Sequence, residues 1–145
     1  MILTVDIGNS NIVLGGVEGD EIRFEARLGT DATKTSDEYC VDLKILMDVY
    51  SVDPEAVEGA IIASVVPQVL NSMQTAVKKL TGQQSLVIGP GLKTGLNIHT
   101  DVPSQVGSDR IVVAVAALAE YEPPLALLDL GTATTIDVVD GENNY

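Results

Sequence analysis

The hydrophobic pattern at the start of the chain predicts three strands joined by tight turns. Within residues 3–14, two apolar runs flank a short polar stretch, which is typical of strand, turn and strand. Residues 22–28 then alternate between apolar and charged side chains, the pattern of a strand with one buried face. Glu18-Gly19-Asp20 forms the turn between the second and third strands. The three strands are therefore predicted to form a meander.

The next part of the chain alternates between helical and strand patterns. Apolar residues at helical spacing begin after Ser36 and again after Pro67, where acidic residues or a proline in the first turn favour a helix start. Between them, residues 59–65 form a continuous apolar run, as expected of a strand covered on both faces. Gly82 ends the second helix, and residues 86–88 form a short fifth strand. This order predicts an α/β fold, a mixed sheet with helices on its faces.

The last part of the chain contains an irregular segment, a helix and a second hairpin pattern. Residues 89–106 are rich in Gly, Pro and Thr, and a loop of this length in a compact domain is usually functional or disordered. A helix is predicted over residues 107–121, where Pro123-Pro124 prevents it from continuing. Residues 125–139 again place two apolar runs around a polar turn. This pattern predicts a second strand–turn–strand unit.

Length and composition set the limits within which these elements pack. The chain has 145 residues, 46% of them apolar, which suffices for a sizeable core and excludes an intrinsically disordered chain. We place a domain boundary near Pro123, with a first domain at residues 1–122 and the start of a second, truncated domain at residues 123–145. The longest apolar run, residues 111–119, is far shorter than the ~20 residues that a membrane span needs.

Charge and cysteine content exclude several classes of protein. Eight basic and 21 acidic residues leave a net charge of −13, which repels nucleic acid and anionic membrane surfaces. Cys40 is the single cysteine, so the sequence has neither a disulfide framework nor a cysteine-based metal site. The N-terminus reaches Asp6 without the basic and apolar regions of a signal peptide. We expect a cytoplasmic protein that binds neither nucleic acid nor membranes.

The turn of the first hairpin has the residues of a candidate anion site. Gly8 allows the backbone to approach a ligand closely because it has no Cβ. Asn9, Ser10 and Asn11 place small hydrogen-bonding side chains beside backbone N–H groups that can surround a phosphate. Asp6 would repel a phosphate unless a metal ion or a water in its shell lies between them. An ordinary hairpin has the same pattern, so this stretch alone leaves both interpretations open.

The second hairpin repeats the design and favours the phosphate interpretation. Asp129-Leu130-Gly131-Thr132 again places a carboxylate, a glycine and a small hydroxyl residue after an apolar strand. Two such Asp-x-Gly hairpins, one in each domain, resemble the phosphate clamp of the actin, heat-shock chaperone and sugar-kinase superfamily. The order of strands and helices before residue 89 also resembles the ribonuclease-H-like sheet with flanking helices of an actin-like ATPase domain.

Two other segments carry candidate chemistry. Residues 89–94 are superficially similar to a P-loop, but Leu92 precedes Lys93, and Gly95 follows where a helix should run, so we reject a P-loop. Asp109 lies in the first turn of the last predicted helix, where the helix dipole stabilises a carboxylate. From its position alone, Asp109 is either a helix cap or a catalytic group.

Three motifs together are similar to those of type III pantothenate kinases. They are the first Asp-x-Gly turn, the glycine-rich loop that leads to the Gly-x-Asp-Arg segment at residues 107–110, and the second Asp-x-Gly turn. Their order and spacing match the family along the whole chain, and other members of the superfamily lack the Gly-x-Asp-Arg segment. Ser10 stands where the family often has Thr, and Ser108 where it often has Ala. Both replacements preserve size. Members of the family are substantially longer than this chain.

This resemblance implies ATP-dependent phosphorylation of the primary hydroxyl of pantothenate, the first step towards coenzyme A. Asp109 would be the general base, and Arg110 would place a positive charge beside the anionic substrate. Asp129 would be the ligand of a monovalent cation, K⁺ or NH₄⁺, while Mg²⁺ would arrive with ATP. The resemblance also implies two sets of binding residues: for ATP, Asp6, Ile7, Gly8, Asn9, Ser10, Asn11, Ile12, Val13 and Thr132, and for pantothenate, Gly107, Ser108, Asp109 and Arg110.

Partners and alternative functions complete the hypothesis. The family resemblance implies a homodimer in the full-length protein, with pantothenate and ATP as its ligands. Because only one hairpin of the second domain is present, we expect little or no kinase activity from these 145 residues alone. One alternative is another small-molecule kinase of the same superfamily. A second is a non-catalytic accessory regulator, although the charge of −13 argues against direct DNA binding.

Overall fold

The chain forms two compact units, Met1–Ile88 and Gly89–Tyr145, in a computed structural model that describes residues 1–89, 91–131 and 133–145. The sequence places a domain boundary near Pro123 instead. The difference arises because the helix before Pro123 makes its contacts with the hairpin that follows it. The assignment of domains at residues 1–122 and 123–145 therefore stays a prediction, and the two units are described separately below.

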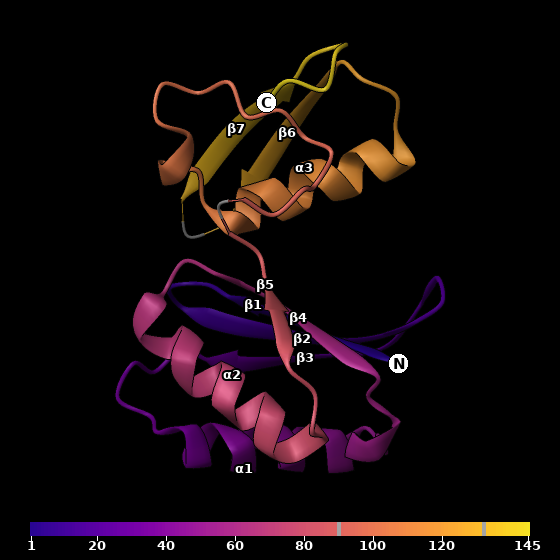
Figure 1. The fold of residues 1–145 in the computed structure, drawn as a ribbon, viewed down its shortest axis with the longest axis vertical. Coiled ribbons are helices and arrows are strands. Elements are labelled where there is room, and N and C mark those ends of the chain that lie inside the picture. The colour runs from indigo at the N-terminus through magenta and orange to yellow at the C-terminus, as the bar shows by residue number, and fades with distance from the viewer. Residues whose placement is uncertain (90, 132) are drawn as a thin grey trace. The chain divides into compact units, whose positions relative to one another are not determined.

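The first unit contains a five-stranded mixed sheet with the strand order β3-β2-β1-β4-β5 (Figure 1). β2 is antiparallel to both of its neighbours, while β4 is parallel to β1 and β5 is parallel to β4. The predicted meander and mixed sheet are thus confirmed. The strands are β1 (Ile2–Ile7), β2 (Asn11–Glu18), β3 (Glu21–Gly29), β4 (Gly59–Ser64) and β5 (Ser85–Val87).

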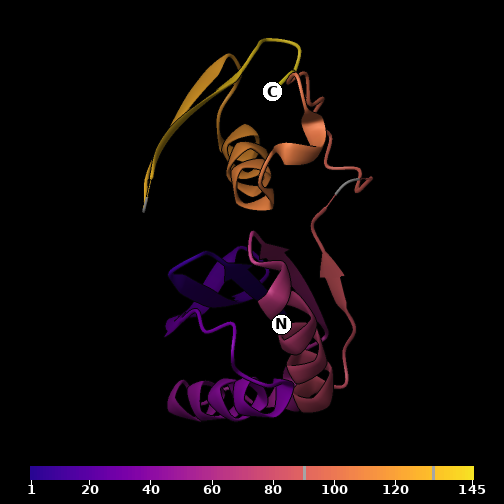
Figure 2. The same ribbon diagram turned by 90° about the vertical axis from the view of Figure 1, so that its left-hand side faces the viewer.

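Two helices, α1 (Ser36–Val49) and α2 (Pro67–Thr81), lie on the same side of this sheet in both views (Figures 1 and 2). α1 begins with a capping box, in which the Thr35 side chain accepts from the Glu38 amide and the Glu38 carboxylate accepts from the Thr35 amide. α2 ends at Gly82, whose φ of 74° is a left-handed conformation that favours glycine. A single 3₁₀ turn, η1 (Pro54–Ala56), precedes β4.

The core of the first unit lies between these helices and one face of the sheet. Leu3, Val5 and Ile7 alternate along β1 and are buried, while Ile2 and Asp6 on the opposite face are exposed. From the other elements the core includes Ile12, Leu14, Phe24, Tyr39, Leu43, Met47, Ile62, Val69, Met73 and Val77. The helices therefore cover the face of β1 from which Asp6 points away.

Two side chains differ from the burial that their spacing predicts. Ile22 is 71% exposed although its alternation places it with Phe24, because a bulge between Gly16 and Val17 shifts the register of β3 against β2. Tyr50, which follows α1, is also exposed, although its helical spacing places it on the same face as the buried residues Leu43 and Met47. Its ring stacks on that of Phe24, with 5.3 Å between the ring centroids.

The second unit contains a loop, one long helix and a two-stranded sheet. The loop includes a 3₁₀ turn, η2 (Pro103–Gln105), and leads into α3 (Ser108–Glu120). β6 (Leu125–Leu130) and β7 (Thr134–Val139) form the antiparallel hairpin that the sequence predicts. α3 contacts both strands. In the described part of both units, no helix combines the length and apolar character needed to cross a membrane.

Candidate functional site

The turn of the first hairpin is held tightly by its own backbone. Ile7 pairs with Ile12, and the Gly8 N–H donates to the Asn11 carbonyl oxygen at 2.9 Å. A Cβ added at Gly8 would lie 3.1 Å from that same oxygen, closer than side-chain carbons ordinarily approach. Asn9 and the other polar residues of the turn are exposed. The turn thus combines a backbone that only glycine fits without adjustment with polar groups open to solvent.

The side chains of the two isoleucines beside the turn cannot contact a ligand. Ile7 and Ile12 are both 0% exposed and belong to the core. Any contact that they make with a nucleotide would have to come from their backbone. Asp6 pairs with Val13 across the hairpin, and its side chain is exposed at the end of β1. Asp6 is therefore the charged residue beside the turn that a ligand can reach.

Thr30, the residue that follows β3, forms two hydrogen bonds with this turn. The Thr30 hydroxyl donates to the Gly8 carbonyl oxygen at 2.7 Å. The Thr30 N–H donates to the Ser10 carbonyl oxygen at 3.0 Å. The sequence analysis did not include Thr30 among the candidate residues. Its only sequence signal is its place directly after the predicted third strand.

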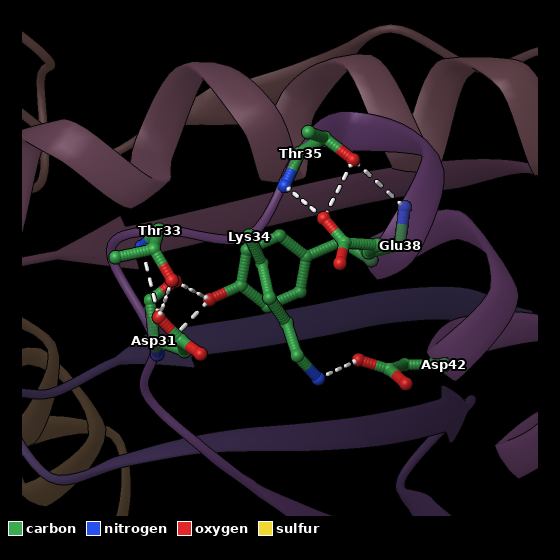
Figure 3. A network of polar contacts seen from close by, with 7 residues as sticks. Asp31, Thr33, Lys34, Thr35, Glu38 and Asp42 are labelled. Carbon is green, nitrogen blue, oxygen red and sulfur yellow. Dashed lines mark hydrogen bonds and ion pairs between the residues drawn. The ribbon is translucent and has the colours of Figure 1, made fainter.

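The loop that carries Thr30 is itself fixed by side chains of α1 and of the loop (Figure 3). The Tyr39 hydroxyl donates to the Asp31 carbonyl oxygen at 2.8 Å and accepts from the Asp31 N–H at 3.2 Å. The Asp31 carboxylate accepts from the Thr33 hydroxyl and N–H, and these bonds hold the pKa of Asp31 below its ordinary value. Lys34 forms an ion pair with Asp42 at 2.6 Å. These contacts fix the loop after β3, which carries Thr30.

In the second unit, Asp109 lies inside the first turn of α3 and not at its N-cap. The N-cap is Gly107, which has no side chain to donate or accept. One carboxylate oxygen of Asp109 accepts the N–H of Arg110 at 2.8 Å. This bond satisfies one of the amides that a helix leaves unpaired at its start. The geometry is compatible with a capping role and with a catalytic role for Asp109.

Arg110 forms a two-pronged ion pair with Asp137 of β7. Its Nε donates to one carboxylate oxygen of Asp137 at 3.1 Å, and an Nη donates to the other. The Tyr145 hydroxyl donates to the same carboxylate at 2.6 Å. Asp137 is only 7% exposed, so these donors compensate a buried charge. We call Arg110, Asp137 and Tyr145 the Arg110 cluster.

The pKa values of the Arg110 cluster reflect this arrangement. Burial raises the pKa of the Asp137 carboxyl, but hydrogen bonds from Arg110 and Tyr145 outweigh it and hold the pKa below the ordinary value. The hydrogen bond to Asp137 raises the pKa of Arg110, which keeps the guanidinium charged. Burial, followed by the hydrogen bond to Asp137, raises the pKa of Tyr145 to about 12. The sequence analysis did not predict Asp137, whose signal is a carboxylate on the same face of the strand as Val139.

The second Asp-x-Gly turn is less constrained than the first. Asp129 pairs with Thr135 and is exposed. A Cβ added at Gly131 would lie 3.5 and 3.7 Å from the two Asp129 carboxylate oxygens, an ordinary contact distance. Thr132, predicted to bind ATP, lies outside the described residues. Among the residues that are described, no three His, Cys, Asp or Glu side chains gather as metal ligands would.

The structure brings the predicted site residues together in two sets. Residues 6–13 lie at one end of the first hairpin, and residues 107–110 lie at the start of α3 with Asp137 beside them. Asp129 lies at the end of β6 in the second unit. Ser108 is buried, while Asp109 and Arg110 are partly exposed. The Gly-x-Asp-Arg segment therefore presents its two charged residues, and not Ser108, to solvent.

Comparison with known proteins adds relatives over the whole chain. A type III pantothenate kinase of Exiguobacterium sp. is 47% identical and one of Brevibacillus brevis is 50% identical, each over all 145 residues. The chain spans 57% of the length of each of these relatives. A solved structure of the Aquifex aeolicus PPX-GPPA enzyme is 16% identical and covers 97% of this chain and 48% of its own. Its TM-score is 0.42, at which no common fold can be inferred.

A family model supplies the remaining comparison. The model described as type III pantothenate kinase matches residues 2–145, a range that includes both Asp-x-Gly turns and the Gly-x-Asp-Arg segment. The chain belongs to the type III pantothenate kinase family.

Proposed function

We propose that the protein to which this chain belongs phosphorylates pantothenate with ATP, giving 4'-phosphopantothenate in the first step of coenzyme A biosynthesis. The observation that carries the proposal is the family match over residues 2–145. The names and the 47–50% identity of the two bacterial relatives support it. We further propose that the mixed sheet belongs to an actin-like ATPase domain at residues 1–122, with a second domain of the same kind beginning at residue 123.

The first turn has the properties that binding of ATP phosphates requires. Phosphoryl transfer depends mainly on positioning and charge stabilisation, because the protein has little covalent chemistry to perform. Gly8 brings the backbone close to a ligand, and Asn9, Ser10 and Asn11 offer amide and hydroxyl groups beside it. The assigned ATP-binding residues are Asp6 to Val13, with Thr132 from the second turn. For Ile7 and Ile12, whose side chains are buried, the contact would be through the backbone.

Pantothenate would bind at residues 107–110. Asp109 would accept the proton of the attacking hydroxyl, since its carboxylate is partly exposed at the start of α3. The Arg110 side chain is 38% exposed, which leaves part of the guanidinium accessible to the carboxylate of the substrate. Because Asp137 balances much of the charge of Arg110, its contribution in a chain of charge −13 would come mainly from the exposed N–H donors of the guanidinium. Gly107 and Ser108 would complete the binding segment.

Two cations belong to the proposal. Mg²⁺ would enter with ATP and would neutralise phosphate charge. A monovalent cation, K⁺ or NH₄⁺, would be held at Asp129, and the exposed carboxylate beside Gly131 has room for such an ion. The proposal also includes a cytoplasmic homodimer.

Product analysis of the full-length protein tests this function. The protein is incubated with ATP, Mg²⁺, K⁺ and pantothenate, and 4'-phosphopantothenate is identified by mass spectrometry while ADP is measured in a coupled assay. We expect one ADP per phosphorylated product and little or no product from the 145-residue chain alone. Preference for a different alcohol would favour the alternative of another small-molecule kinase. A failure to phosphorylate any alcohol would favour an accessory regulator.

A further inference from the structure

We propose that Thr30 is a positioning residue, which fixes the Gly8 turn so that its backbone can bind the phosphates of ATP. This inference rests on the proposed function in one respect, the assignment of the first turn to ATP. Thr30 lies outside every motif that relates the chain to its family in the sequence analysis. It is identified by its contacts alone, the hydroxyl bond to Gly8 and the amide bond to Ser10.

The bond from the Thr30 hydroxyl determines the direction of one peptide group of the turn. A trans peptide is planar, and its C=O and N–H point in opposite directions. Because the Gly8 carbonyl oxygen is held 2.7 Å from the Thr30 hydroxyl, the N–H of Asn9 in the same peptide must point away from Thr30. An N–H in that orientation is a donor for an anion on the other side of the turn. Without the hydroxyl, this peptide can rotate more freely and the donor loses its fixed direction.

Thr30 is itself held in place, so that it can act as a fixed donor. The next residue, Asp31, is bound through both its N–H and its carbonyl oxygen to the hydroxyl of Tyr39. Tyr39 is fully buried in the core of the first unit. On the other side, Gly29 is the last residue of β3 and pairs with Asn11. The position of the Thr30 hydroxyl is thereby set by the core and by the sheet.

Substitution of Thr30 in the full-length protein tests the proposal. Thr30→Val removes the hydroxyl and keeps the branched shape, and Thr30→Ser keeps the hydroxyl. Loss of one such bond corresponds to about a three- to tenfold change in affinity. We expect Thr30→Val to raise KM for ATP by about that factor, with KM for pantothenate unchanged. Thr30→Ser should keep KM for ATP at the wild-type value, because the hydroxyl is retained. If the branched shape of the side chain were what matters, Thr30→Ser would raise KM for ATP and Thr30→Val would not.

Thr33→Val is a matched control in the same loop. The Thr33 hydroxyl donates only within the loop, to the Asp31 carboxylate at 2.6 Å. This variant should leave KM for ATP unchanged. Equal effects of Thr33→Val and Thr30→Val would mean that any loosening of the loop weakens the site, and the inference would be wrong. An unchanged KM for ATP in Thr30→Val would also overturn it. If the valine variant does not fold, Thr30→Ala is measured in its place.

Equilibrium binding of a non-hydrolysable ATP analogue separates this inference from the proposed function. If the full-length protein does not phosphorylate pantothenate, the proposed function fails, yet the analogue can still be titrated into the wild type and the three variants. Weaker binding in Thr30→Val alone would support the role of Thr30. Equal binding in all four proteins would overturn it, whatever the substrate of the enzyme is.

Discussion

The two Asp-x-Gly hairpins share a sequence pattern but differ in what surrounds them. β1 and β2 lie inside a five-stranded sheet, between β3 and β4. β6 and β7 pair only with each other in the described part of the chain. Ile7, next to the first turn, is fully buried, whereas Leu130, at the same place in the second hairpin, is 74% exposed. The two hairpins thus share a local sequence pattern but differ in how deeply their side chains are buried.

The comparison shows that the local motif predicts the hairpin, whereas the surrounding elements determine whether it is buried. Alternating apolar residues around a glycine turn are enough to predict a hairpin, because strand pairing and turn geometry are local. Burial requires partners from other parts of the chain, and the first hairpin obtains them from its neighbouring strands β3 and β4 and from the core that it shares with α1 and α2. The exposed apolar residues of the second hairpin, Leu128, Leu130, Ile136 and Val138, form an uncovered face. Such an exposed apolar face is prone to associate with other apolar surfaces.

The largest expected effect on turnover comes from Asp109, which lies outside both hairpins. The effects expected in the hairpins are compared with it. Asp109→Asn in the full-length protein should lower turnover by at least about a hundredfold, because a positioned general base contributes about 10²–10⁴ in rate. Asparagine keeps an oxygen that can accept the Arg110 N–H, so thermal unfolding should hardly change. Turnover and melting temperature are measured on the same preparation. Lower stability with most of the rate retained would identify Asp109 as a cap.

The next effect compares the carboxylates of the two hairpins directly. Asp6→Asn and Asp129→Asn should each lower turnover by about tenfold or more, the scale of a lost interaction with a charged group. Both side chains are exposed, so the melting temperature should stay within a few degrees of the wild type. Titration with K⁺ distinguishes them. Only Asp129→Asn should raise the K⁺ concentration needed for half-maximal rate, and the same shift in Asp6→Asn would contradict the assignment of the cation to the second hairpin.

A smaller effect concerns the glycines of the two turns. Gly8→Ala places a Cβ 3.1 Å from the Asn11 carbonyl oxygen, so the turn must shift slightly, and we expect a cost of about 1 kcal/mol, at the lower end of the range for overpacking. Gly131→Ala places its Cβ 3.5 Å or more from its neighbours and should cost less than about 0.5 kcal/mol, as surface substitutions do. Denaturant unfolding of the two variants measures the difference. Equal losses would show that the second turn is as constrained as the first.

Much of the fold was predictable from the sequence, because its signals are local. Helix starts at Ser36 and Pro67, the left-handed end at Gly82 and both hairpins follow from capping, proline and glycine preferences. The exposure of Ile22 was not predictable, because it depends on a bulge in the pairing of β2 with β3. Contacts that join distant segments were also missed.

The candidate site shows the same limit. Its motif residues were found from their types and order, and their roles stay predictions. The two residues that hold motif residues in place were not found. Thr30 contacts Gly8 across the sheet, and Asp137 contacts Arg110 between α3 and β7. Neither residue has a sequence pattern of its own, since an ordinary threonine after a strand and an aspartate within one become informative only when the chain is folded.

The smallest expected effect is a shift in the titration of Tyr145, which tests whether the Arg110 cluster links β7 to α3. Tyr145 should form its phenolate near pH 12 rather than near the ordinary value of about 10, because burial and the bond to Asp137 favour the neutral hydroxyl. The difference in absorbance at alkaline pH between the wild type and Tyr145→Phe isolates this one tyrosine. Asp137→Asn should return the midpoint towards about 10, since the carboxylate that accepts the hydroxyl is lost.

The Arg110 cluster also predicts how the free energy of unfolding changes with pH. Stability is lost at acid pH through Asp137 and at alkaline pH through Tyr145. The folded pKa of Asp137 is lowered, so its stabilising contribution is present above the ordinary aspartate range and is lost as the pH falls through the folded pKa. The folded pKa of Tyr145 is raised, so its contribution is present below about pH 10 and is lost as the pH rises to about 12. Denaturant unfolding of the wild type and Asp137→Asn across both ranges measures the two losses. Parallel curves for the two proteins would mean that Asp137 and Arg110 do not stabilise the second hairpin, and that α3 and β7 are held by their apolar contacts alone.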